Sequence, residues 1–305
     1  KLKEVISIAD SVTVIRDGQT IVTLSASKNE ITEDVIIRNM VGRQIQDIYP
    51  KRNKNISDEK VLELKNWSAY DPKIGRYVAK NVNMYVRKGE IIGLAGLMGS
   101  GRTELALSIF GNAKSYKLEG DLLIDGMPIV LKHTSDAIKA GIAYVTEDRK
   151  GDGLFLLQDI KSNISVANVQ SIATNGIIND NEEIKVAEEY KSSLRIKANS
   201  LEQIVGKLSG GNQQKVSLGK WLFVGPKLLI LDEPTRGIDV GAKFEIYSVM
   251  NKLIEEGLSI IMISSELGEV LGMSDRVYVM ADGENKGELP IKEADQEKIM
   301  QLATQ

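Results

Sequence analysis

The sequence predicts an α/β fold with a mostly parallel core sheet. Three short apolar runs, at residues 90–95, 228–231 and 260–263, have the length and composition of buried strands. Segments with helical periodicity lie between them, including residues 182–194 and 244–253. Strands that alternate with helices along a chain are typical of parallel sheets, because each helix returns the chain to the edge where the next strand begins.

The composition fits a globular chain with a sizeable core and limits its chemistry. The 305 residues are 42% apolar and 27% charged, with a formal net charge of −3. This balance gives no reason to expect a nucleic acid partner, and the one basic run, residues 51–54, is interpreted as a solvated linker. The absence of cysteine and the single histidine, His133, exclude disulfides, thiolate sites and multi-histidine metal sites. No apolar run approaches the roughly 20 residues of a membrane helix.

An internal repeat relates the two ends of the chain. Residues 1–24 align without a gap with residues 266–289 at an offset of 265, and 9 of the 24 pairs are identical. Both copies predict the end of a helix, a strand, an Asp-Gly turn and a second strand. We therefore expect a fragment in which residues 1–50 are the tail of a preceding unit plus a connector. Residues 51–305 are then a second unit.

The remaining elements follow from local patterns. Residues 61–64 and 85–86 alternate apolar and polar side chains, which predicts two further strands. The stretch from about residue 150 to residue 220 is rich in helical patterns and predicts a separate helical lobe.

A glycine-rich loop directly after the first buried strand is the clearest functional motif. Its sequence is GLMGSGRT, residues 96–103, and residues 104–110 predict a helix behind it. This order and spacing match a phosphate-binding loop, except that Arg102 replaces the usual lysine. Glycines let backbone N–H groups close around phosphate oxygens, and the Thr103 hydroxyl is placed to bind Mg²⁺. Arginine keeps the charge of lysine but not its compact geometry.

Two more segments suit phosphate chemistry. The apolar strand at residues 228–231 is followed by Asp232 and Glu233, which are placed to hold Mg²⁺ and to polarise an attacking water. Ser209 and two glycines open a predicted helix, whose N-terminus attracts anions. Each segment also has a plainer interpretation, as an acidic turn or as an ordinary helix cap. Three such elements in one chain favour nucleotide binding.

Together, the phosphate loop and the motifs LSGGNQQK and LDEPTRGIDVGAK resemble the ATP-binding-cassette (ABC) ATPases, which are P-loop NTPases. The resemblance covers essentially the whole chain and is most specific to the second, C-terminal cassette of the tandem ATPase subunits of bacterial monosaccharide importers of the ribose, galactose and xylose type. It implies an antiparallel β subdomain, ATP and Mg²⁺ as ligands, and a first cassette in the same polypeptide. It also implies an integral-membrane sugar permease and, indirectly, a sugar-binding protein as partners, at the cytoplasmic face of the bacterial inner membrane.

The resemblance assigns roles to individual residues. Thr103 and Asp232 would bind Mg²⁺, and Asp239 would lie in the loop that links the two sites of a cassette dimer. Tyr70, with Tyr77 as the alternative, would stack on adenine. The other nucleotide contacts would come from Gly96, Gly99, Ser100, Gly101 and Arg102 of the phosphate loop, and from Ser209, Gly210, Gly211, Asn212 and Gln213 of the signature, which faces the γ-phosphate on the opposing cassette.

Three positions depart from the general ABC pattern. Besides Arg102, Glu147 replaces the glutamine near Mg²⁺, and Ser265 replaces the switch histidine. Glu233 would be the catalytic glutamate. A second carboxylate would repel the γ-phosphate, and serine offers no imidazolium to developing charge. The sequence therefore predicts a cassette that binds nucleotide, hydrolyses it slowly, and mainly completes the site of the other cassette.

Two other functions stay open at this stage. One is a soluble tandem ABC protein that acts on ribosomes or DNA, against which the near-neutral charge argues. The other is a regulatory module that binds nucleotide without hydrolysing it. For the importer, we expect the permease to dock around Glu147 and residues 152–167. The segments at residues 67–78 and 111–126 look closest to the xylose or multiple-monosaccharide branch.

Overall fold

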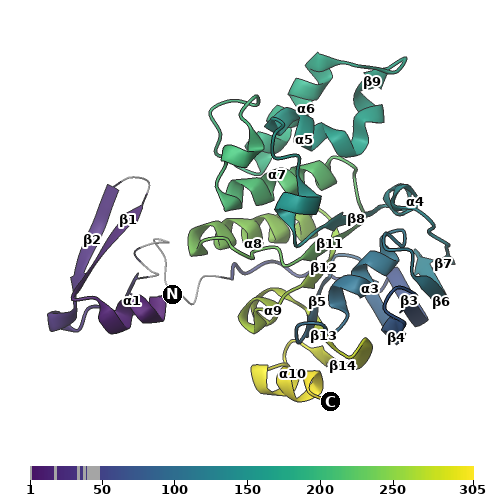
Figure 1. The fold of residues 1–305 in the computed structure, drawn as a ribbon, viewed down its shortest axis with the longest axis horizontal. Coiled ribbons are helices and arrows are strands. Elements are labelled where there is room, and N and C mark those ends of the chain that lie inside the picture. The colour runs from purple at the N-terminus through teal and green to yellow at the C-terminus, as the bar shows by residue number, and fades with distance from the viewer. Residues whose placement is uncertain (1, 17–18, 33–34, 37–38, 40–48) are drawn as a thin grey trace.

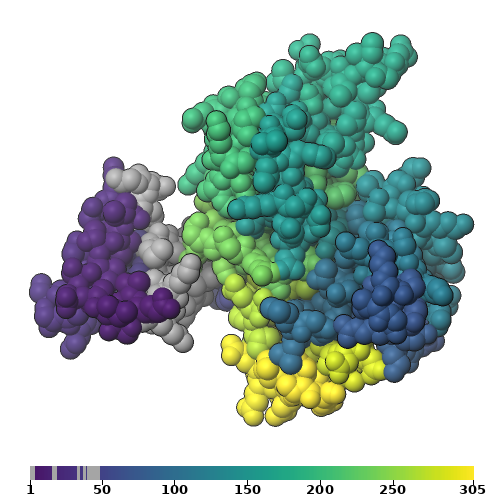
Figure 2. Space-filling model, viewed as in Figure 1, coloured from purple at the N-terminus to yellow at the C-terminus, as the bar shows by residue number. Residues whose placement is uncertain are grey.

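The computed structural model describes residues 2–16, 19–32, 35–36, 39 and 49–305, and it consists of two parts of unequal size (Figure 1). The small N-terminal part lies apart from the rest of the molecule, as the space-filling view also shows (Figure 2). In the large part, a mainly helical segment lies over one side of a central sheet, and a second sheet lies beside it (Figure 1).

The central sheet has six strands in the order β14-β13-β5-β12-β11-β8, all parallel except the antiparallel edge strand β14. The strands are β5 (Ile91–Gly96), β8 (Ile142–Val145), β11 (Leu228–Asp232), β12 (Ser259–Ile263), β13 (Arg276–Ala281) and β14 (Glu284–Pro290). The three predicted buried strands are thus confirmed as the neighbours β5, β12 and β11. Because these strands are parallel, the loops that follow them meet at one edge of the sheet.

The second sheet is antiparallel, with the order β4-β3-β6-β7. Its strands are β3 (Lys60–Asp71), β4 (Arg76–Arg87), β6 (Lys117–Ile124) and β7 (Met127–Pro128). Leu62 and Met84 of this sheet share one hydrophobic core with Ile92 of the central sheet. The Trp67 indole also donates to the Ser108 hydroxyl at 2.9 Å. The sheet therefore packs against α3 (Arg102–Ile109), the helix behind the phosphate loop, and the expected antiparallel β subdomain is confirmed.

A mainly helical segment follows β8, as the sequence predicts for residues 150–220. Its elements are η3 (Arg149–Gly153), α5 (Ile160–Ser165), η4 (Val166–Ile172), β9 (Ala173–Thr174), β10 (Ile177–Ile178), α6 (Asp180–Ser193), η5 (Val205–Lys207) and α7 (Gly210–Leu222). The short β9–β10 hairpin is not predicted, because two residues per strand are too few to produce a periodic pattern. Ile164 and Val216 join Leu229 of the central sheet in a second core, which fixes the segment on that face.

The other helices of the large part are α3 (Arg102–Ile109), α4 (Thr134–Lys139), α8 (Val240–Glu255), α9 (Leu267–Met273) and α10 (Gln296–Ala303). They differ in their caps, and Asp239 and Asp295 cap α8 and α10 with their side chains. His133 caps α4, with its backbone N–H donating to Asp136 at 3.0 Å, so this histidine has a structural position. None of the helices in the described ranges is both long and apolar enough to cross a lipid bilayer.

The N-terminal part repeats the local structure of the C-terminal end. Its elements α1 (Leu2–Ile8), β1 (Ser11–Arg16) and β2 (Gln19–Ser25) each begin and end 265 positions before α9, β13 and β14. The strand registers also match, including the irregularity after Val14 and after Val279. The first Asp-Gly turn, residues 17–18, lies outside the described residues. Among the described residues, the small core of this part is centred on Val14 and Leu24 and draws on side chains between Ile6 and Ile36.

The connector is anchored to the large part from residue 49 onward. The Tyr49 ring lies 5.3 Å from the Tyr247 ring, and a Cβ added to Gly272 would approach it to 2.3 Å. Arg52 forms an ion pair with Asp275, and both side chains are at most 5% exposed. The interpretation of the basic run as a solvated linker is therefore wrong for Arg52, because the buried Asp275 carboxylate requires a cation.

This anchoring makes a prediction for truncated proteins. Deleting residues 1–48 should leave the thermal midpoint of the remainder nearly unchanged, because the anchors are retained. Deleting residues 1–55 removes Arg52 and leaves the buried Asp275 carboxylate without its cation. Breaking a buried ion pair in this way costs about 3–5 kcal/mol. Thermal unfolding of both truncations measures the difference, which should be roughly 10 °C. Equal midpoints for the two truncations would contradict it.

Candidate functional site

The phosphate loop lies between β5 and α3, and its backbone conformation requires glycine. Gly96, Gly99 and Gly101 have φ values of 154°, 79° and 94°. A Cβ at Gly96 would come within 2.4 Å of the Met280 carbonyl oxygen, and one at Gly101 within 2.3 Å of the Val78 carbonyl oxygen. The loop is thus wedged between β13 and β4. It presents its N–H groups at the start of α3, where the helix dipole favours an anion.

Asp232 and its neighbours fit a magnesium–nucleotide complex. Asp232 is 1% exposed, and its Oδ2 accepts from the Tyr144 hydroxyl at 2.8 Å. Its Oδ1, like the Ser100 hydroxyl of the phosphate loop, is buried without a hydrogen-bond partner among the described residues. Burial raises the pKa of Asp232, while hydrogen bonds from Tyr144 and Thr103 oppose that shift. A cation held between Asp232 and Thr103 would satisfy the buried oxygen and neutralise phosphate charge.

Glu233 lies in a strained and crowded position. Its φ of 48° is in the left-handed region, which costs a non-glycine residue of the order of 1 kcal/mol. One carboxylate oxygen accepts from the Ser265 hydroxyl at 3.0 Å, and the other lies 4.0 Å from the Arg102 guanidinium. Because β12 lies between β5 and β11, the Ser265 loop falls between the two motifs. The structure therefore brings these three predicted residues together.

Arg102 is turned toward the switch loop as well as the phosphate loop. It is 8% exposed and donates to the Ser264 carbonyl oxygen at 2.7 Å. Burial lowers the pKa of Arg102, and the charges of Glu233 and Asp232 oppose that shift. Part of its hydrogen-bonding capacity is thus used within the protein, which distinguishes it from a lysine whose ammonium points only at phosphate.

Glu147 is paired rather than free. Its carboxylate forms an ion pair with Arg236, in the turn after β11. The adjacent Arg149 donates to the Arg236 carbonyl oxygen at 2.9 Å and to Gln214 of α7 at 3.3 Å. The loop at Glu147 therefore joins the signature helix to the turn that carries Glu233. The nearby Arg236 cation also offsets the negative charge of Glu147, which reduces its expected repulsion of phosphate.

The signature residues divide into an exposed group and a packed group. Ser209 is exposed at the N-cap of α7, and its hydroxyl accepts from Asn212 at 2.9 Å instead of capping the helix. Gly211 lies against α8, where an added Cβ would come within 2.6 Å of the Ala242 Cβ. Gln213 is 5% exposed and donates to the Val205 carbonyl oxygen. Gln213 therefore stabilises the lobe and does not share the exposed position of Ser209.

The remaining predicted residues lie at the edges of this region. Tyr70 and Tyr77 are paired across β3 and β4, with ring centroids 5.2 Å apart. Tyr77 directly precedes Val78, which contacts the phosphate loop, so the geometry keeps both tyrosines as candidates for an adenine contact. Asp239 is exposed and caps α8, accepting from the Ala242 N–H at 2.9 Å.

Sequence reasoning missed several residues that shape the site. Tyr144, Arg236 and Thr235 give no local pattern, because each acts through a contact with a distant segment. Glu269 is 1% exposed and bonds both Thr235 and Ser264, and burial raises its pKa. One signal could have found it: Glu269 matches Glu4 as one of the identical pairs in the repeat.

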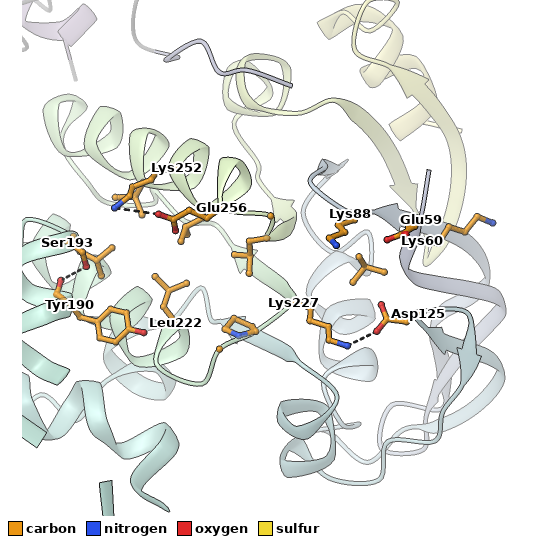
Figure 3. Close-up of a pocket in the computed structure, with 18 of the residues that line it drawn as sticks. Glu59, Lys60, Lys88, Asp125, Tyr190, Ser193, Leu222, Lys227, Lys252 and Glu256 are labelled. Atoms are coloured by element: carbon orange, nitrogen blue, oxygen red, sulfur yellow. Dashed lines mark hydrogen bonds and ion pairs between the residues drawn. The ribbon is translucent and has the colours of Figure 1, made fainter. Parts of the chain in front are cut away.

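A large groove lies elsewhere in the described part of the chain. It has a volume of about 1070 Å³ and lies between the start of β3, α6 and the end of α8 (Figure 3). Its rim carries ion pairs such as Lys227 with Asp125 at 2.6 Å and Lys252 with Glu256 at 3.6 Å. None of the predicted site residues lines it. The groove is therefore separate from the nucleotide site.

A glycine-rich phosphate loop, a buried aspartate with an unpartnered oxygen and an exposed serine at the start of α7, on this sheet topology, define a P-loop nucleotide-binding cassette. The match of a family model confirms this class, since the ABC transporter model covers residues 79–236. The chain belongs to the ABC transporter family.

Relatives with curated names resemble the chain over its whole length. It is 51% identical to the L-arabinose transport ATP-binding protein AraG of Geobacillus stearothermophilus and 54% identical to the xylose import ATP-binding protein XylG of Thermoanaerobacter pseudethanolicus. Both alignments cover 100% of this chain but only 59% and 60% of the relatives, so the chain spans well under two thirds of their length. Among solved structures, an ATP-binding cassette of an ABC transporter is 22% identical, with a TM-score of 0.69, covering 80% of this chain and 98% of the other. That likeness confirms the fold.

Proposed function

We propose that this chain is the ATP-binding part of a bacterial importer that couples ATP binding and hydrolysis to monosaccharide uptake. The observation that carries the proposal is the identity of about half of all residues, over the full chain, to arabinose and xylose import proteins. Both sugars are pentoses, so pentoses are the first substrates to test. ATP with Mg²⁺ would bind at the phosphate loop, Asp232 and Thr103.

The repeat supports a tandem arrangement in which residues 1–50 end a first cassette and the rest form the second. Matching elements at a constant offset of 265 place β1 and β2 where β13 and β14 lie in the second unit. In that unit β13 also pairs with β5, the strand before the phosphate loop. By analogy, β1 would pair with the corresponding strand of a first cassette in the same polypeptide.

The contacts of Glu233 support slow hydrolysis in this cassette. A general base must be available to the attacking water, yet this carboxylate is bonded by Ser265 and lies near the Arg102 guanidinium. The signature side remains exposed at Ser209. The cassette would therefore serve mainly to complete the site of its partner. A purely regulatory, non-hydrolysing module is the second candidate, and the same contacts favour it.

Two exposed apolar side chains support the expected permease contact. Phe155 and Leu157 are 56% and 88% exposed, and both lie in the predicted docking region at residues 152–167. They directly follow η3, which Arg149 connects to the signature helix. An exposed apolar pair in this position suits a helix of a membrane permease at the cytoplasmic face of the inner membrane, with a sugar-binding protein acting on the other side.

Leu157→Glu in the full-length protein should abolish co-purification with a polytopic permease, because it places a charge in an apolar contact. ATP binding should be unchanged, since Leu157 lies outside the nucleotide site. Ile177→Glu, at a residue that is 74% exposed in the β9–β10 hairpin, is the matched control and should retain the permease. Affinity purification from membranes measures both variants.

The same purification tests the importer itself. If the full-length wild-type protein copurifies with no integral-membrane protein, and membrane vesicles take up no pentose on addition of ATP, the importer proposal is wrong. Turnover of the full-length protein without any permease would instead favour a soluble function.

A further inference from the structure

A buried carboxylate connects the two loops that carry the reactive residues. Glu269, on α9, accepts a hydrogen bond from the Thr235 hydroxyl at 3.0 Å and another from the Ser264 hydroxyl. All three side chains are 1% exposed. Thr235 lies two residues after Glu233, and Ser264 directly precedes Ser265. One side chain therefore joins the turn after β11 to the loop after β12.

The bonds around this carboxylate reach the site from both sides. The Ser264 carbonyl oxygen accepts a hydrogen bond from Arg102 at 2.7 Å. The Ser264 hydroxyl accepts another from the Glu266 N–H at 3.0 Å. On the other side, the Ile238 N–H bonds the Thr235 carbonyl oxygen at 3.3 Å, next to Asp239. Hydrogen bonds thus connect Glu269 both to the Ser265 loop and to the segment before Asp239.

We propose that Glu269 is a positioning residue that makes the Glu233 turn and the Ser265 loop move as one unit. The proposal rests on the proposed function, because it assigns Glu269 to the hydrolytic cycle of the cassette dimer. Glu269 touches no reacting atom in this arrangement. It acts by keeping Thr235 and Ser264 at a constant separation, so that closure at one loop is transmitted to the other.

The repeat provides independent support. Glu4 occupies the position of Glu269 in the N-terminal copy and is identical to it, as are the flanking pairs Leu2/Leu267 and Val5/Val270. Glu4 is exposed. The exposed Glu4 has a role if its carboxylate accepts hydrogen bonds from the hydroxyls of a first cassette that correspond to Thr235 and Ser264.

Hydrogen exchange in the 305-residue chain tests the connection without any turnover. Glu269→Gln should speed amide exchange in residues 235–238 and in residues 264–266, each by about fivefold to tenfold, the effect of losing about 1–1.5 kcal/mol. The test is reciprocal. Thr235→Val should speed exchange in residues 264–266, and Ser264→Ala should do so in residues 235–238. If each change stays confined to its own loop, the two loops are independent and the proposal is overturned.

ATP hydrolysis by the full-length protein with its permease tests the role. Glu269→Gln should lower the maximal rate about tenfold with an unchanged KM for ATP, a change of about 1.4 kcal/mol in the barrier. The loss can exceed that of Glu233→Gln, because the Thr235 turn continues to Asp239, which is expected to reach the partner cassette's site. Glu90→Gln is the matched control, because Glu90 is also 1% exposed but pairs with Arg276 at the opposite end of β5. Its rate should stay within twofold of wild type, even though it too loses stability.

The outcomes distinguish a failure of the positioning role of Glu269 from a failure of the proposed function. Equal rates for Glu269→Gln and the wild type would overturn the positioning role, and so would a loss matched by Glu90→Gln. If the wild-type complex hydrolyses no ATP, the proposed function fails, and the exchange experiment still decides whether Glu269 couples the loops.

Discussion

Ser209→Arg in the full-length protein should reduce transport-linked ATP hydrolysis by at least about 100-fold, the loss typical of removing an essential transition-state contact. Ser209 is exposed at the start of α7, and its hydroxyl is not used to cap the helix. If it covers the γ-phosphate bound on the opposing cassette, a long guanidinium at this point prevents closure. Ser171→Arg adds the same side chain at another exposed serine of the helical segment and should leave hydrolysis unchanged.

Glu233→Gln tests which of the two cassettes carries out most of the hydrolysis. It should lower hydrolysis less than about threefold, because this carboxylate is already bonded by Ser265 and lies 4.0 Å from the Arg102 guanidinium. The chain alone should turn over far below the range of about 1–10³ s⁻¹ typical of enzymes. ATPase rates of the two full-length variants measure this directly. A loss from Glu233→Gln equal to that from Ser209→Arg would show that the site in this chain is catalytic.

Gly101→Ala should abolish binding of Mg-ATP and destabilise the chain by about 3–5 kcal/mol. The left-handed φ of 94° costs alanine about 1–2 kcal/mol, and the new Cβ would lie 2.3 Å from the Val78 carbonyl oxygen. Backbone cannot move aside as a flexible side chain can, so α3 must shift away from β4. Urea unfolding and binding of a fluorescent ATP analogue measure the two effects.

Gly99→Ala is the matched control for this substitution. Its φ of 79° imposes similar backbone strain, but an added Cβ meets nothing within 4 Å. We expect a loss of only about 1 kcal/mol and measurable nucleotide binding. Equal destabilisation by the two variants would show that strain alone, and not the contact with β4, explains the requirement for glycine at Gly101.

Much of this protein could be predicted from local patterns. Continuous apolar runs located β5, β11 and β12, and the spacing of glycines around Arg102 located the phosphate loop. The repeat located the hairpins at both ends, because a gapless alignment preserves the length and register of every element. These features depend on residues close together in the chain, so a single sequence is sufficient to reveal them.

Only the tertiary structure decided which side chains pair across the site. The ion pair of Glu147 with Arg236, the burial of Arg52 against Asp275 and the bonds of Glu269 each join different segments of the chain. A carboxylate has the same local appearance in a sequence whether it is solvated or buried. Its role depends on which strands the sheet places side by side, and therefore on the strand order that brings the loops after β5, β12 and β11 to one edge.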